Sequence, residues 1–452
     1  MRRLKPPQVV IFSFLIAILI GAALLSLPQS SSNGESIGAV DAFFTATSAT
    51  CVTGLIVKDT GSDFSDFGRL IILLLIQIGG VGIMTLSTFF AILLGRKLTL
   101  RENVVVKGAL DHHSVLGLKT LIVYILGITF CLETIGAVLL YNRFGDIYFS
   151  IFHAISAFCN AGFSLNAASF TLYRQDTYAN LVMIALIILG GIGFIVLIDI
   201  PKIFRWAFRK LFLGSKEGIK HLFVQISLQT KMAVSVSAML LLLGAAVFFL
   251  LENHQILDGL GLKDKILTSF FQSTTSRTAG FNTVSISDLA SPTLFFVIIL
   301  MFIGASPGST GGGIKTCTFG VLLAGAWSMI KNRNHIQGFK KTIPRPVFRK
   351  AVMIAGLAVT WIVAFTMLLS FVERGHEAMP NYFLKILFEV TSAFGTVGLS
   401  TGITPILSPA GKFLIMLTMF VGRIGPLTLA LAVAMKEQQI IYKYPEEKVM
   451  VG

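Results

Sequence analysis

Long apolar segments alternate with short polar ones along the whole chain. Eight of them approach the roughly 20 residues that a helix needs to cross a bilayer. We expect membrane spans over residues 9–27, 69–94, 120–141, 179–200, 231–251, 293–329, 350–372 and 411–435. Between the two spans of each successive pair lies a shorter apolar stretch, such as Ala42 to Ala49. The pattern predicts an all-α polytopic membrane protein in which each short stretch is a re-entrant half-helix.

The four short stretches are copies of one motif that ends at a glycine. The glycines are Gly54, Gly162, Gly280 and Gly398, separated by 108, 118 and 118 residues. Ten residues earlier stand Phe44, Phe152, Phe270 and Phe388; six earlier stand Ser48, Ser156, Thr274 and Ser392; one later stand Leu55, Phe163, Phe281 and Leu399. Such self-similarity is typical of a repeat architecture. Because every copy lies between an odd and an even span, we expect four parallel helix–re-entrant loop–helix repeats around a central pseudo-fourfold pore. They cover residues 1–95, 119–204, 231–330 and 347–435, with a C-terminal tail at 436–452.

The end of each motif has the composition of an ion-selectivity filter. A dehydrated cation needs a ring of oxygens, which backbone carbonyls supply in the T-V-G-Y-G loops of potassium channels. Glycine adopts the required backbone angles without strain. One glycine in an apolar stretch is more often a helix-packing site, but four at matched offsets favour a filter. The predicted filter residues, which would bind potassium through their carbonyls, are Thr50, Cys51, Val52, Thr53, Gly54, Phe158, Cys159, Asn160, Ala161, Gly162, Ser276, Arg277, Thr278, Ala279, Gly280, Phe394, Gly395, Thr396, Val397 and Gly398.

The sixth span is interrupted by a polar, glycine-rich stretch. It reads Gly304, Ala305, Ser306, Pro307, Gly308, Ser309, Thr310, Gly311, Gly312, Gly313, Ile314, Lys315 and Thr316. A proline and five glycines cannot remain one continuous helix, and irregular backbone at membrane depth must line an aqueous cavity. We interpret residues 304–316 as an intramembrane gating loop, with Lys315 adding a charge to the barrier. A cytoplasmic linker between two shorter spans is the alternative, and it would put the later loops on the wrong side.

Two arginines lie near these elements. Gly304 and Gly422 each follow their filter glycine by 24 residues, so Arg423 should lie at the depth of the gating loop. A charge there needs a partner; loop carbonyls would let Arg423 latch the gate, and simple structural anchoring is an equal alternative. Arg277 would repel potassium if it faced the pore, so we expect it to point away and brace its loop through carbonyls.

Other ionisable residues lie within apolar segments. Asp41 either charges a pore entrance or begins a half-helix, where a carboxylate suits the helix dipole. His153 and Glu389 both stand nine residues before a filter glycine. For His153 we favour a hydrogen-bonded interior imidazole over a proton relay, and Glu133 is a similar but better functional candidate.

Composition and charge agree with a membrane location. The mean hydropathy is +0.80, and only 13% of residues are charged. Of the 37 basic residues, 25 precede the first span or follow an even-numbered one. The positive-inside rule therefore places both termini in the cytoplasm and explains the net charge of +15 without nucleic acid. The apolar N-terminus is longer than a typical signal peptide, so we expect an uncleaved span. The four cysteines have no metal-ligand spacing and do not suggest a disulfide framework.

These residues together resemble the Trk, Ktr and HKT superfamily of cation transporters. The resemblance covers nearly the whole chain and is most specific in the four filter motifs, in G-A-S-P-G-S-T-G-G-G-I-K-T and in F-V-G-R-I-G-P-L-T. The chain enters its first repeat almost at once and ends in a tail similar to those of Ktr proteins. It therefore looks most like the membrane subunit of Ktr potassium-uptake systems, of the KtrB or KtrD type.

The resemblance implies a potassium-uptake protein of the bacterial plasma (inner) membrane. It implies a homodimer surrounded by lipid, with one pore per chain, on a cytoplasmic regulatory ring that binds ATP or ADP. Potassium would be the substrate, without a covalent cofactor, and the family leaves sodium stimulation open. Residues 304–316 would be the gate and Arg423 its partner. Serine in place of the first filter glycine accompanies sodium permeation in the family, so Gly54 favours potassium.

Two other functions stay open at this point. A sodium-permeable channel or a cation symporter would also use a broken helix at the midplane; the parallel orientation of the repeats favours a pore. A membrane-embedded enzyme would need converging catalytic residues. The sequence contains no H-E-x-x-H and no aspartate pair in adjacent spans.

Overall fold

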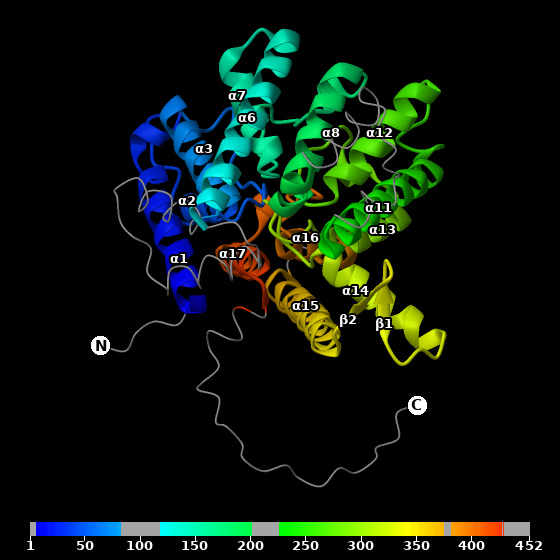
Figure 1. The fold of residues 1–452 in the computed structure, drawn as a ribbon. Helices are drawn as coiled ribbons and strands as arrows, with labels where there is room; N and C mark the ends of the chain where they lie inside the picture. Colours follow the sequence, from blue (N-terminus) through cyan, green and yellow to red (C-terminus); the bar gives the residue numbers. More distant parts are fainter. Residues whose placement is uncertain (1–5, 83–117, 201–225, 375–380, 427, 429–452) are drawn as a thin grey trace, which may run out of the picture.

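The computed structural model describes residues 6–82, 118–200, 226–374, 381–426 and 428. Helices dominate these residues (Figure 1). They are α1 (Pro6–Leu25), α2 (Ala39–Thr50), α3 (Asp66–Val81), α6 (Leu118–Phe144), α7 (Ile147–Phe158), α8 (Thr177–Gly191), α11 (Leu228–Glu252), α12 (Leu262–Thr275), α13 (Ser291–Phe302), α14 (Thr316–Ile330), α15 (Arg345–Val372), α16 (Tyr382–Gly395) and α17 (Pro409–Ile424), with short 3-10 turns at Pro28–Ser30, Thr171–Tyr173, Ile286–Asp288 and Thr404–Ile406.

The chain builds the same three-helix unit four times. Each unit has a long first helix (α1, α6, α11, α15), a short half-helix (α2, α7, α12, α16) and a second helix (α3, α8, α13, α17). The long helices are apolar over enough residues to cross a membrane, at 8–25, 122–144, 228–252 and 345–372. The second helices begin with a capping Ser or Asp in three units, where Ser65, Asp176 and Ser408 accept a backbone N–H.

Contacts between units close into a ring. The second helix of each unit packs on the half-helix of the next: α3 on α7, α8 on α12, α13 on α16, and α17 back on α2. The half-helices end just before the filter glycines, and most of the residues in their second halves are buried. The first phenylalanine of the motif is fully buried in three units, as Phe44, Phe152 and Phe388. The motif is therefore a packing pattern as well as a loop pattern.

Two expected spans are not continuous helices. The sixth is broken, as predicted, into α13 and α14 with irregular backbone between them. The fourth, expected as one helix over 179–200, bends by 106° between Gly191 and Phe194. Gly193 has a φ of +96° at the bend, and the Phe194 N–H leaves the helix to donate to the Gly308 carbonyl at 2.8 Å. The expected ends of the second and eighth spans run outside the described residues.

One element was not expected from the sequence. Residues after α14 form an antiparallel hairpin, β1 (Ile336–Gly338) and β2 (Lys341–Ile343), which packs against α14 (Figure 1). Ile343 buries its side chain among α11, α14 and α15. The surrounding basic residues give this segment the composition of a solvated linker. The buried Ile343 alone was therefore not enough to predict the hairpin from the sequence.

Candidate functional site

The four predicted filter loops share one unusual backbone conformation. Two residues before each glycine, a residue with a side chain has a positive φ: Val52 (57°), Asn160 (58°), Thr278 (75°) and Thr396 (49°). The glycines themselves have φ of 91°, 72°, 79° and 91°. A left-handed residue with a Cβ costs about 1–2 kcal/mol. Strain repeated at four equivalent positions is typical of a functional site that the surrounding structure holds in place.

The four loops meet one another in chain order. A methyl group added at Gly54 would overlap the Ala161 carbonyl oxygen, and one at Gly398 would overlap that of Thr53. At Gly162 it would lie 2.9 Å from the Ala279 oxygen, and at Gly280 it would lie 2.6 Å from the Val397 oxygen. Each glycine thus faces the carbonyl of the residue that precedes another filter glycine, and the fourth loop returns to the first.

The small hydroxyl of the motif supports this backbone. Ser48 Oγ accepts the Gly54 N–H at 3.1 Å, and Ser392 Oγ accepts the Gly398 N–H at 3.2 Å. In the second loop Ser156 instead donates to the Phe163 carbonyl at 2.8 Å. Thr274 in the third loop donates back along its own helix to Phe270. The hydroxyl thus bonds the filter backbone in three loops.

His153 and Glu389 clasp the segment that follows their glycine. His153 Nδ1 contacts the Phe149 carbonyl at 2.8 Å, and Nε2 contacts Ser164 Oγ at 3.0 Å. Glu389 accepts from Ser400 Oγ (2.6 Å), Thr401 N (2.8 Å), Thr401 Oγ1 (3.2 Å) and Thr404 Oγ1 (2.8 Å). At the same offset the first and third loops have Thr45 and Phe271, so loops two and four alone have this clasp in the part of the chain that the structure describes.

Removing the Glu389 clasp is expected to destabilise the fourth loop. Glu389→Leu leaves several buried donors without an acceptor, which should cost about 3 kcal/mol or more. Glu389→Gln keeps one carbonyl oxygen and should cost less. Thermal melting of the purified variants measures both. Thr45→Val is the matched control, because Thr45 Oγ1 bonds no described residue at the equivalent position; equal losses in Thr45→Val and Glu389→Leu would contradict the clasp.

The predicted gating loop lies against three filter loops. The Gly312 N–H donates to Thr396 Oγ1 at 2.9 Å, and Thr310 Oγ1 donates to the Phe158 carbonyl at 3.3 Å. A methyl group at Gly311 would overlap the Thr278 hydroxyl. The loop therefore touches the strained residues of the third and fourth loops and the end of the half-helix of the second.

The rest of this loop is held by the second and third units. Ser306 N donates to the Gly191 carbonyl at 3.0 Å, and Ser306 Oγ contacts Thr316 Oγ1 at 2.9 Å. The two ends of the loop pack against each other. Gly304 lies against Gly312 and Gly313, and the Ala305 carbonyl accepts from Thr316 N. Pro307 and Gly308 adjoin the bend at Gly193, and Ser309 Oγ is buried and bonds no described residue. Lys315 Nζ donates to the Gly311 carbonyl of its own loop at 2.5 Å.

Arg423 reaches this loop from the fourth unit. Its guanidinium donates to the carbonyl oxygens of Thr310 and Gly79. Gly79 in turn packs against the Thr50 carbonyl at the end of the first half-helix. Gly190 and Gly422 pack in the same way on the carbonyls of Phe158 and Phe394. These glycines thus let the second helices approach the backbone of the predicted filter loops. Arg423 also joins two of the second helices, because it lies on α17 and donates to Gly79 on α3.

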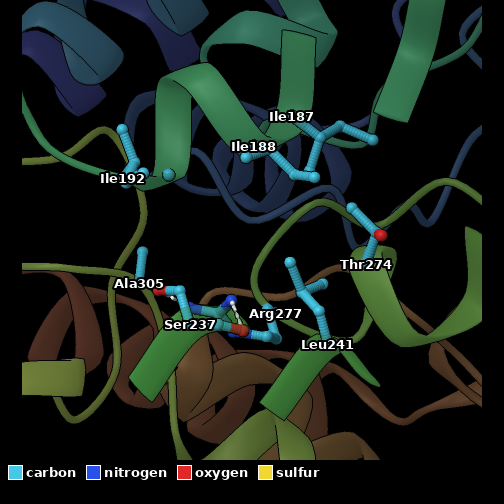
Figure 2. A pocket seen from close by; sticks show the side chains of 9 residues that line it. Ile187, Ile188, Ile192, Ser237, Leu241, Thr274, Arg277 and Ala305 are labelled. Atoms are coloured by element: carbon cyan, nitrogen blue, oxygen red, sulfur yellow. Dashed lines mark hydrogen bonds between the residues drawn. The ribbon is translucent and has the colours of Figure 1, made fainter. Parts of the chain in front are cut away.

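Arg277 points away from the other loops, into the space between α8 and α11. Its Nη atoms donate to the Ser237 carbonyl at 3.3 Å and to Ser237 Oγ at 3.0 Å (Figure 2). The side chain lines a cavity of about 20 Å³ together with Ile188, Leu241 and Thr274. The partner is therefore the neighbouring helix rather than the filter backbone. The negative end of α12, which closes at Thr275, lies beside this cation.

An ion pair joins the first and fourth units. Lys412 Nζ lies 2.7 Å from Asp41 Oδ1, and the two side chains are 13% and 19% exposed. Asp41 lies in the first turn of α2, as expected if it begins the half-helix. Its partner Lys412 is 371 residues away in the sequence. The pair therefore fixes the contact at which the ring of units closes.

Breaking this pair is expected to weaken the closure. Asp41→Asn or Lys412→Met should lower stability by about 1–3 kcal/mol, between the values typical of exposed and buried pairs. The exchanged pair, Asp41→Lys with Lys412→Asp, should recover part of that loss. Melting of the purified variants measures it. The control is Asp66→Asn, which breaks the ion pair between Arg69 and the 87% exposed Asp66 side chain. It should change stability by less than about 1 kcal/mol.

A polar cluster behind the second loop was only partly foreseen. Glu133 Oε2 accepts from Gln77 Nε2 at 3.0 Å, and Cys159 Sγ donates to Glu133 Oε1 at 3.7 Å. Glu133 was a candidate because it is a carboxylate within a span. Its partners come from another unit and from the filter loop, and nothing in the spacing of the three residues joins them.

Comparison with known proteins places the chain in a family. A family model described as cation transport protein TrkH matches residues 5–444. The chain is 39% identical to the Ktr system potassium uptake protein B of Bacillus subtilis, over 100% of this chain and 97% of that protein. It is 37% identical to the potassium/sodium uptake protein NtpJ of Enterococcus hirae, over 100% of this chain and 98% of that protein.

A solved structure shows the same fold. The potassium transporter TrkH of Vibrio parahaemolyticus superposes with a TM-score of 0.67 at 21% identity, over 93% of this chain and 84% of that one. The expected membership of the Trk and Ktr group is thereby confirmed, as is a mostly helical, multi-pass membrane protein. The chain belongs to the TrkH family of cation transport proteins.

Proposed function

We propose that this chain takes up potassium ions across a bacterial plasma membrane through a pore lined by its four filter loops. The observation that carries the proposal is the closed sequence of contacts between each filter glycine and a carbonyl of another loop. Such a ring can bring backbone oxygens around one axis, where they replace the water of a dehydrated cation. Because the half-helices end just before the glycines, the negative ends of their dipoles also favour a cation there.

The names of the relatives support potassium as the cargo. Two of them are potassium uptake proteins B, from Bacillus subtilis and Vibrio alginolyticus. The relative NtpJ carries potassium/sodium in its name, which makes a sodium-permeable pore the second candidate. Gly54 favours potassium, because this chain has glycine where family members that pass sodium carry serine.

We further propose that the gating loop and a cytoplasmic partner regulate the pore. Residues 304–316 would close the pore below the filter, and Arg423 would hold them closed. The chain has no nucleotide-binding motif of its own, so control by ATP or ADP requires a cytoplasmic Ktr-type regulatory ring. We further propose a homodimer with cytoplasmic termini; sodium stimulation would be a property of this assembly.

Uptake in cells tests the function directly. A bacterial strain without potassium uptake should regain growth at low potassium when it makes this chain together with a Ktr-type regulatory subunit. It should also take up rubidium, and potassium should compete with rubidium far better than sodium does. Equal competition by sodium would assign the chain to the second candidate. Failure of all uptake, with the protein present in the membrane, would refute the proposal.

A further inference from the structure

A groove of about 490 Å³ opens on the outside of the helices between α3, α6 and α7. Its walls are apolar and exposed: Phe130 is 54% exposed, Val138 55% and Ile147 68%. Side chains of this kind on a transmembrane helix face lipid. One end of the groove lies at the turn between α6 and α7, beside Tyr141 and Ile147. The other lies about two helical turns deeper, where Gln77 and Glu133 complete the lining.

Glu133 is a buried carboxylate without a cationic partner. Its oxygens accept from the Gln77 amide and the Cys159 thiol, both neutral groups. In the described part of the chain no lysine, arginine or histidine forms an ion pair with it. Both of its oxygens serve as acceptors. A carboxylate this deep is costly unless a cation or several donors accompany it.

We propose that this groove is a binding site for amphiphilic amines. The ammonium group would lie against Glu133 and the alkyl chain would fill the apolar walls toward Tyr141. Charge complementarity selects this ligand class, because a neutral lipid chain would satisfy the walls but leave the carboxylate unpaired, and a hydrophilic cation would do the reverse. The inference does not depend on which ion the loops conduct.

Occupation of the groove reaches the second filter loop through one hydrogen bond. Cys159, which belongs to that loop, donates to Glu133 Oε1 at 3.7 Å and has Gln77 Oε1 as its other acceptor at 3.6 Å. A bound amine therefore competes with the thiol for the carboxylate. Amine binding should consequently slow rubidium uptake by the intact chain.

Binding to the purified protein in nanodiscs tests the site independently of transport. The probes are octylammonium and its uncharged analogue 1-octanol, titrated by calorimetry with partitioning into protein-free discs subtracted. The parent chain should bind the amine about tenfold more tightly than the alcohol or better. Glu133→Gln, which keeps the size of the side chain, should remove that preference while leaving octanol binding unchanged.

Two wall variants separate the groove from general lipid contact. Val138→Trp fills the groove and should weaken both probes. Val363→Trp makes the same change at a 50% exposed position on α15, away from the groove, and should weaken neither. Melting curves show whether each variant is folded. Equal affinity for amine and alcohol in the parent chain, an unchanged preference in Glu133→Gln, or equal losses in the two tryptophan variants would overturn the proposal.

Discussion

Replacing Gly54 by serine is expected to reduce the preference for potassium over sodium by about tenfold or more. Two effects act together at this position. The φ of +91° suits glycine and strains any residue with a Cβ, and the new Cβ would overlap the Ala161 carbonyl. The neighbouring backbone is buried and close-packed, so the overlap can be relieved only by moving loop one or loop two. Carbonyl oxygens that leave their positions no longer match a dehydrated potassium ion.

A matched control separates backbone strain from the contact between loops. Gly402 has a φ of +89°, almost the same as Gly54, but no atom lies within 4 Å of the Cβ it would gain. Gly402→Ser should therefore cost about 1 kcal/mol in stability and leave ion preference unchanged. Rubidium uptake with potassium or sodium as competitor measures both variants in cells with the same amount of protein. If the two serines had the same effect on preference, the contact between the loops would not be the cause.

Much of the central site could be predicted from the sequence because it rests on local backbone chemistry. Glycines at matched offsets marked the positions of positive φ, and the proline and glycines between α13 and α14 marked the broken span. The sequence also predicted that Arg277 points away from the other loops, but not that its partner is Ser237 on α11. Each of these inferences needs only the residue and its own surroundings.

The parts that could not be predicted depend on partners far away in the sequence. The bend after α8 exists because Phe194 donates to Gly308 in another unit, and a run of glycines is equally compatible with a straight helix. Lys412 carried no signal that it would meet Asp41. The equal offsets of His153 and Glu389 were visible, but the hydroxyls that they contact lie in loops of irregular backbone. Tertiary contacts decide these features, and a single sequence does not display them.

Arg423→Gln is expected to raise rubidium flux about tenfold or more. The guanidinium makes charge-assisted hydrogen bonds to the carbonyls of Thr310 and Gly79, each typically worth about 1.5–3 kcal/mol. If these bonds exist only while the loop is closed, their loss shifts the population toward the open loop. Lysine has one compact ammonium and cannot replace the fork of donors, so Arg423→Lys should lie between the parent and the glutamine variant.

The control is an arginine that also donates to two backbone carbonyls but lies outside the gating loop. Arg69 donates to the carbonyls of Thr60 and Gly61 outside the gating loop, so Arg69→Gln should not raise flux. Deleting residues 305–313 should raise flux by itself, and adding Arg423→Gln to that deletion should then have little further effect. Such non-additivity is expected when two changes remove one latch. If Arg423 only anchors the structure, Arg423→Gln should lower both the melting temperature and the rubidium flux. Its effect should then persist in the deletion variant, because the bond to the Gly79 carbonyl would still be lost.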